Sequence, residues 1–237
     1  MADGILRSCS AVGVLCLCLL GMSSVAKAGI VVDASVGGAP TGVSYANFDG
    51  LPPGATGGMS NGIAVSFAGD GQAVTGSMSG VYAAPFLSNG NGTLFGDPNN
   101  GPDTTRFLTT GVGSVTLVLP GEEKYVGLLW GSVDNYNTLS LYNGSTLVGT
   151  VTGMDVTASA TGDQGASGTF YVNINSTDSF DRIVATSSSY AFEFDNVAYN
   201  QSAVPEPSSF VLALIGVMGA ATYTKMRRKG STIGNKC

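Results

Sequence analysis

The apolar residues between Gly29 and Ala203 fall into short runs that either alternate with polar residues or are apolar throughout, and turn residues separate these runs. The 3.6-residue repeat of an amphipathic helix is missing from this body, so the pattern predicts strands. Many short strands without helices indicate an all-β domain, and we expect a β-sandwich of jelly-roll type. The predicted strands cover residues 43–48, 62–67, 73–82, 114–119, 125–130, 138–142, 146–151, 169–174, 182–186 and 190–199.

The clearest local signal is a hairpin centred on Asn143-Gly144. This pair of residues favours the two positive φ angles of a type I′ turn, which connects antiparallel strands through two residues. Such a turn would pair Tyr142 with Ser145 and Leu139 with Val148.

The N-terminus has the three parts of a secretory signal peptide. Arg7 supplies a positive charge, residues 11–20 form an apolar stretch, and the small residues Ala26 and Ala28 fit a cleavage site. We therefore expect residues 1–28 to be removed during export, which leaves a mature chain that starts at Gly29.

The C-terminus carries a second signal, in which Pro205-Glu206-Pro207 precedes an apolar run at residues 210–223. The run is shorter than the ~20 residues of a comfortable spanning helix, but flanking basic side chains can reach the membrane interface and should stay cytoplasmic. An ordinary membrane anchor and a buried core helix are alternative interpretations. The basic residues after the run are Lys225, Arg227, Arg228 and Lys229.

These signals divide the chain into four parts. Residues 1–28 are the signal peptide and residues 29–203 the β domain. Residues 204–230 form a sorting signal with a single transmembrane span, and residues 231–237 form a short tail.

The C-terminal arrangement resembles the PEP-CTERM tail of bacterial proteins that are handled by exosortase. The body also resembles exosortase-dependent surface proteins of cyanobacteria and proteobacteria, in residues 48–53 (FDGLPP), 125–137 (YVGLLWGSVDNYN) and 192–197 (FEFDNV). The resemblance implies export through the inner membrane, processing by an exosortase-type enzyme, and a final place at the cell surface or in the extracellular matrix. It implies no defined biochemical activity.

The charge of the body narrows the choice of partners. Arg106, Lys124 and Arg182 are its only cations against fourteen carboxylates, a net charge of −11. Phosphate binding needs clustered cations, so nucleic acid is excluded as a partner. Divalent cations or neutral polysaccharide fit such a surface better.

Histidine is absent from the whole sequence, and the four cysteines fall outside the body, at Cys9, Cys16, Cys18 and Cys237. A Ser-His-Asp hydrolase, a Cys-His protease and nearly every catalytic zinc site are therefore excluded. The mature body can form no disulfide and can use no thiol chemistry.

A candidate ligand loop follows the run Leu128-Leu129-Trp130, which is apolar on both faces as expected for an inner strand of two packed sheets. An aromatic ring beside Asp and Asn side chains is a common way to hold a sugar. The alternatives are core packing for Trp130 and a plain turn for the residues after it. The loop consists of Trp130, Asp134, Asn135, Tyr136 and Asn137.

A candidate Ca²⁺ site combines Asp49, at the end of the first clear predicted strand, with Glu193 and Asp195 on the last. First and last strands are often neighbours in a jelly roll, and Glu193 and Asp195 share a face because they are two residues apart. Ca²⁺, the only cofactor that the sequence offers, needs 6–8 oxygen ligands. The alternative is that these carboxylates line a solvated face or cap strand ends.

The leading hypothesis is a non-enzymatic surface protein that is exported, sorted through its tail and associated with extracellular polysaccharide or biofilm matrix. An alternative makes the body a carbohydrate-binding module that uses the loop after Trp130, with Ca²⁺ as a stabilising ion. A further alternative is a glycosidase that uses two carboxylates across a cleft, although no motif marks such a pair.

Overall fold

The computed structural model describes residues 29–35 and 38–204, and the expected all-β fold is confirmed for them. The predicted signal peptide with its cleavage residues Ala26 and Ala28 lies outside the described residues, as do the Pro205-Glu206-Pro207 motif, the apolar run and the basic cluster from Lys225 to Lys229. The strands are β1 (Ile30–Ser35), β2 (Ser44–Ala46), β3 (Gly57–Ser60), β4 (Ile63–Ala68), β5 (Gln72–Val74), β6 (Phe86–Leu87), β7 (Gly101–Pro102), β8 (Phe107–Thr110), β9 (Ser114–Gly131), β10 (Asn137–Asn143), β11 (Thr146–Thr152), β12 (Phe170–Ser187) and β13 (Phe192–Asn200).

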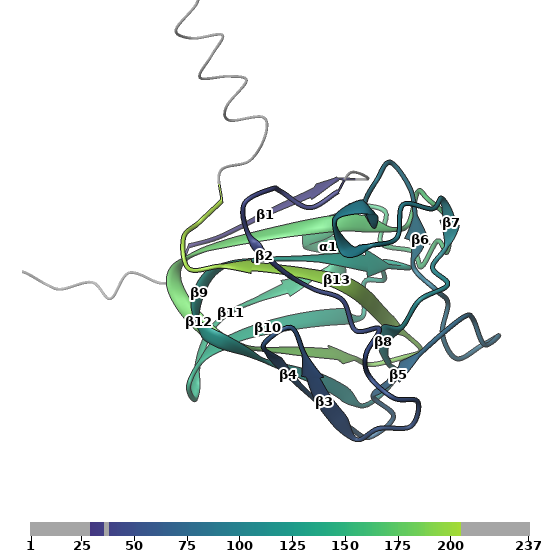
Figure 1. The fold of residues 1–237 in the computed structure, drawn as a ribbon, viewed down its shortest axis with the longest axis horizontal. Coiled ribbons are helices and arrows are strands. Elements are labelled where there is room, and N and C mark those ends of the chain that lie inside the picture. Colours follow the sequence, from purple (N-terminus) through teal and green to yellow (C-terminus); the bar gives the residue numbers. More distant parts are fainter. Residues whose placement is uncertain (1–28, 36–37, 205–237) are drawn as a thin grey trace, which may run out of the picture.

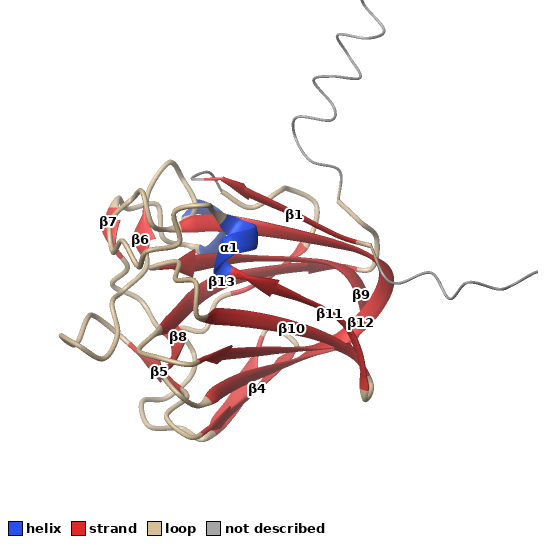
Figure 2. Cartoon of the chain, turned by 180° about the vertical axis from the view of Figure 1, so that it is seen from behind, coloured by secondary structure: helices blue, strands red, loops and turns tan. Residues whose placement is uncertain are grey.

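Two helical turns complete the regular structure of the described residues. The 3₁₀ turn η1 spans Thr93–Phe95, and the one-turn helix α1 spans Gly153–Val156 beside β1 and β11 (Figure 2). A capping box starts α1, because the Asp155 carboxylate accepts from the backbone N–H of Thr152 and the Thr152 side chain accepts from the backbone N–H of Asp155. No helix within 29–35 and 38–204 has the length and apolar character that crossing a bilayer requires.

Two strands of 18 residues, β9 and β12, organise the whole sheet. They pair with each other twice, once between residues 125–130 and 170–175 and again between residues 114–118 and 182–186. Register shifts lie between these two stretches, where both strands bend from one half of the sheet into the other (Figure 1). The sequence pattern predicted two separate strands in place of β9 and two in place of β12, because the polar residues of the bends are of the types found in turns.

The bend divides the sheet into two halves that share one core. One half contains β1, β13, β2, β8 and β5 around the first β9–β12 stretch, and the other contains β11, β10, β4 and β3 around the second. Side chains from both halves form a single hydrophobic cluster, in which the apolar positions of each strand alternate as the sequence pattern predicted. Its members include Val115, Leu117, Leu128, Trp130, Leu139, Val172, Ile174, Ile183, Phe192 and Phe194.

The segment between β5 and β8 covers the outer face of the first half. Phe95 of η1 packs there against Tyr45 and Tyr171, and Leu129 of β9 belongs to the same second cluster. Leu128 and Trp130 point into the main core, so the expected burial of this run on both faces is confirmed. Its outer face is covered by this segment, which contains the small two-stranded sheet of β6 and β7 and contributes Leu87 of β6 to the same cluster.

The β10–β11 hairpin is confirmed, but its predicted register was wrong. Asn143 pairs with Thr146, Tyr142 pairs with Leu147, and a register shift between Leu141 and Tyr142 follows. Gly144 has a φ of +56°, whereas Asn143 and Ser145 do not have positive φ. The two turn residues are therefore Gly144 and Ser145, one position later than a type I′ turn at Asn143-Gly144 would place them.

The predicted strand at residues 73–82 was also wrong, because only β5 is extended there. Gly76 and Gly80 have φ angles of +68° and +74°, which break the strand. A bridge between Met78 and Tyr82 closes the resulting turn. This turn forms one wall of the cleft described next.

Candidate functional site

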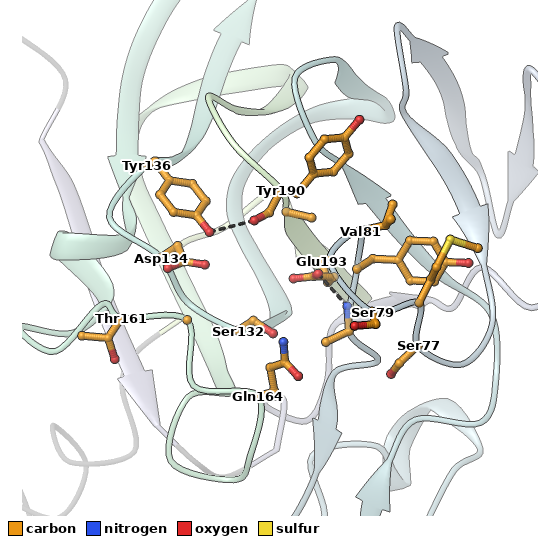
Figure 3. A pocket seen from close by; sticks show the side chains of 16 residues that line it. Ser77, Ser79, Val81, Ser132, Asp134, Tyr136, Thr161, Gln164, Tyr190 and Glu193 are labelled. Carbon is orange, nitrogen blue, oxygen red and sulfur yellow. Dashed lines mark hydrogen bonds between the residues drawn. The ribbon is translucent and has the colours of Figure 1, made fainter.

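A cleft of about 560 Å³ opens beside the start of β13 (Figure 3). Four segments far apart in the sequence line it: the turn at residues 77–83, the loop after β9 at residues 132–136, the loop at residues 161–164, and residues 190–193. In Figure 3, the side chains of Asp134, Ser132, Gln164 and Glu193 surround its open centre. These four side chains are polar, whereas apolar residues such as Met78 and Val81 line another part of the cleft.

Backbone geometry places Asp134 at the cleft. The chain leaves β9 through Ser132, whose φ is +46°, and Val133 is then held by the carbonyl of Gly168 and the N–H of Gly162. Asp134 itself forms an isolated bridge with Thr161. Gly162 has a φ of +73°, and a Cβ there would lie 2.7 Å from both carboxylate oxygens of Asp134. Only glycine therefore lets the 161–164 loop pack this closely around the carboxylate.

Glu193 lines the cleft with only 2% of its surface exposed. Its Oε1 accepts a hydrogen bond from the backbone N–H of Ala83 at 2.9 Å, whereas Oε2 has no donor in hydrogen-bond geometry. Burial raises the pKa of this carboxyl group to about 7, and the charge of Asp134 raises it further. The N–H of Ala83 and the nearby Ser132 hydroxyl act in the opposite direction and lower the pKa. Glu193 therefore titrates near neutral pH, unlike an ordinary surface glutamate.

Asp134 is the second carboxylate of the cleft and is 8% exposed. Burial raises its pKa, and the hydroxyl of Tyr136 partly offsets the shift. The same hydroxyl donates to the carbonyl oxygen of Tyr190 at 2.9 Å, which joins the loop after β9 to the residues before β13. Burial, followed by the neighbouring Asp134, raises the pKa of Tyr136.

The structure divides the predicted ligand loop between core and cleft. Trp130 is fully buried and stacks on Phe192 with 4.3 Å between ring centroids, so it offers no platform to a ligand. Asn137 is also buried, where it donates to the carbonyl of Ala191 and accepts from the hydroxyl of Ser187. Asn135 is exposed and does not line the cleft. Only Asp134 and Tyr136 of this set face the cleft.

The predicted Ca²⁺ set is divided as well. Asp49 and Asp195 lie near each other, as expected, but their additional neighbour is Asp103, and Glu193 faces the cleft instead. Asp195 is fully buried without a hydrogen-bond partner for either oxygen, and Asp49 accepts from the N–H of Arg106 at 3.0 Å. Residues 29–35 and 38–204 contain no group of three or more acidic, His or Cys side chains arranged to hold a metal ion.

Sequence reasoning identified Asp134, Tyr136 and Glu193 but did not place them together. It missed Gln164 and the turn at residues 77–83, because that turn carried the alternation of a strand. A usable signal was the pair Gly76 and Gly80, since glycines spaced through a short apolar run indicate breaks in a strand.

The chemistry of the cleft follows from its charges. The described residues that line it include two carboxyl groups but no lysine or arginine. Carboxylates accept hydrogen bonds from hydroxyl and ammonium groups, whereas they repel anions in a partly dry site. No protein-family model matches the chain, and no curated protein matches it.

Proposed function

We propose that this protein is a non-enzymatic, exported surface protein of the PEP-CTERM type, and that the cleft of its β domain binds extracellular polysaccharide. One observation carries the binding proposal: Asp134 and Glu193, both almost fully buried, line the same open cleft of about 560 Å³, together with Tyr136 and Gln164. Sugar hydroxyls donate to carboxylates, and an amide can both donate and accept. The binding residues thus differ from the Trp130 platform of the sequence hypothesis.

The fold and the chain end support this assignment. We take the folded-over sheet to be a β-sandwich of jelly-roll type, because its two halves share one core. Asn175 exchanges two hydrogen bonds with the backbone of Val204, at 2.8 and 3.0 Å. These hydrogen bonds attach the chain to the domain immediately before Pro205. In our proposal the sorting signal begins there, crosses the membrane and is processed by an exosortase-type partner.

Titration of the full chain, in mild detergent, with the extracellular polysaccharide of its producer tests the binding function. We expect saturable binding that Asp134→Asn weakens, while Asp178→Asn, an exposed substitution outside the cleft, leaves it unchanged. Unaltered binding by the Asp134 variant would contradict the site. Localisation is tested by the intact mass of the surface protein, which should end near Pro207 only in hosts that have exosortase.

A second candidate function is glycoside hydrolysis. It is favoured by one observation: Glu193, whose pKa is about 7, shares the cleft with a second carboxyl group, Asp134. An acid that keeps its proton near neutral pH and a second carboxylate are the groups that glycosidases use. Release of reducing ends from the polysaccharide, abolished by Glu193→Gln, would favour this alternative over simple binding.

A further inference from the structure

The cleft holds two carboxyl groups whose negative charge, once they are ionised, its walls do not balance. Asp134 and Glu193 both line it, and among the described residues around it there is no cationic side chain. Buried carboxylates are normally paired with a cation or surrounded by hydrogen-bond donors. Oε2 of Glu193 has no cation and no partner in hydrogen-bond geometry, with the Ser132 hydroxyl as a nearby polar group, although the side chain is only 2% exposed. This oxygen is therefore available to a donor that arrives with a ligand.

We propose that the ligand is an amino sugar with an unacetylated amine, whose ammonium group binds between the carboxylates of Asp134 and Glu193. The proposal rests on the proposed function, because it names the class of sugar that the same cleft takes. An ammonium group has three N–H donors and can serve both side chains at once. Charge-assisted hydrogen bonds are about twice as strong as neutral ones, and the sheltered position of the two carboxylates strengthens them further.

The remaining polar groups of the cleft suit the rest of a sugar ring. Ser132 and Gln164 surround the same open centre as the two carboxylates (Figure 3). A hydroxyl and an amide can each donate and accept, so they can bind ring hydroxyls in either role. The carboxylates can therefore bind an ammonium group, while the hydroxyl and the amide around them bind the hydroxyls of the same sugar.

Other charged ligands fit less well. A uronic acid would bring a third carboxylate into a cleft without cations, where like charges repel strongly. Acetylation of the amine removes the positive charge and adds bulk at the same place. Ca²⁺ needs 6–8 oxygen ligands, whereas the described residues offer no group of three or more acidic side chains arranged to hold a metal.

The test compares oligosaccharides of equal length by isothermal titration of the full chain in mild detergent. The probes are oligomers of glucosamine, N-acetylglucosamine, glucose and galacturonic acid, each titrated with EDTA and again with CaCl₂. We expect the glucosamine oligomer to bind about tenfold more tightly than the glucose oligomer. The N-acetylated oligomer should bind no better than glucose, and the galacturonate should not bind.

Glu193→Gln provides the decisive variant because it removes the charge while keeping the shape and the hydrogen-bond acceptor. It should reduce the preference for glucosamine over glucose to less than about twofold, and this ratio of the two affinities is the readout, because Glu193 also contributes to binding of neutral sugars. Glu122→Gln is the matched control, since Glu122 is exposed on the β9 bend outside the cleft. It changes the net charge equally and should preserve the preference.

Each contrary result has a defined meaning. Equal affinity for glucosamine and glucose, or equal loss of preference in both Gln variants, overturns the ammonium site and leaves polysaccharide binding intact. A requirement for CaCl₂ with every sugar also overturns it. Failure of every oligomer and of the producer's polysaccharide to bind overturns the proposed function together with this inference.

Discussion

Glu193 at the start of β13 accepts a hydrogen bond from the backbone N–H of Ala83 at 2.9 Å, across 110 positions of the sequence. This contact fixes the turn at residues 77–83 against the sheet and so forms one wall of the cleft. The second oxygen of the carboxyl group, Oε2, has no hydrogen-bond partner. One oxygen of Glu193 therefore holds the turn in place, and the other is a candidate ligand contact.

Glu193 makes stability depend on pH in a defined direction. Its pKa is about 7 in the folded protein against an ordinary value of 4.5, so between these values the folded state retains a proton that the unfolded state has lost. The free energy of unfolding therefore decreases as pH rises through this window and levels off above pH 7. From the cost per pKa unit, we expect Glu193→Gln to be more stable than wild type at pH 8 by up to about 3 kcal/mol.

Denaturant unfolding of both proteins at pH 5 and pH 8 provides the measurement. The stability difference between Glu193→Gln and wild type should grow with pH, whereas Glu122→Gln should follow wild type at both values. If the difference in unfolding free energy between Glu193→Gln and wild type is the same at both pH values, the raised pKa of Glu193 is contradicted.

Asp195 should show a related effect at a position that no ligand reaches. Burial, followed by the neighbouring Asp103, raises its pKa well above the ordinary value. Ionisation of this carboxyl opposes folding, so stability decreases as pH rises above the ordinary value of 3.8. We expect Asp195→Asn to raise Tm at pH 8 more than at pH 5, while the exposed Asp178→Asn raises it at neither. A lower Tm at pH 8 would show that the charged form is stabilising.

The single tryptophan reports directly on the core assignment. Trp130 is fully buried against Phe192, so its fluorescence should be blue-shifted and resistant to iodide quenching. Trp130→Ala should cost about 3–5 kcal/mol of unfolding free energy because it opens a cavity. Red-shifted emission that iodide quenches would place the ring at the surface and restore the sugar platform predicted from the sequence.

Gly162 tests whether the position of Asp134 matters for binding. Alanine at Gly162 requires an unfavourable φ of +73° and places a Cβ 2.7 Å from the carboxylate. Gly144→Ala is a matched control, because its φ of +56° is similarly unfavourable but nothing lies within 4 Å of the added atom. Both variants should lose about 1–2 kcal/mol of stability from the backbone alone. Only Gly162→Ala should weaken polysaccharide binding, by about tenfold or more; equal binding by both variants would remove Asp134 from the site.

The strands were predictable where their side chains alternate or form short apolar runs. Residues 138–142 and 146–151 lie in β10 and β11, and the last predicted strand, residues 190–199, covers all of β13 except Asn200. The continuity of β9 and β12 was not predictable, because Pro120-Gly121 resembles a turn although it lies within a bent strand. The register of the hairpin depended on which residues formed the turn, because turn type and loop length fix the register of a hairpin.

The site was predictable in its residue types but not in its geometry. Asp134 was chosen in the loop after a predicted strand and Glu193 as a carboxylate on the last predicted strand, and they were assigned to different sites. Their meeting depends on the pairing of β13 with β9, in which Glu193 lies opposite Gly131. Such long-range pairing leaves no local pattern in the sequence.

Hydrogen–deuterium exchange tests the central claim most directly. The full chain would be compared with and without the extracellular polysaccharide of its producer, under conditions that saturate binding. We predict slower exchange in the segments at residues 77–83, 132–136, 161–164 and 190–193, which line the cleft, and none of this protection in Asp134→Asn. Protection confined to other parts of the domain, or no protection at saturation, would contradict the cleft as the polysaccharide site.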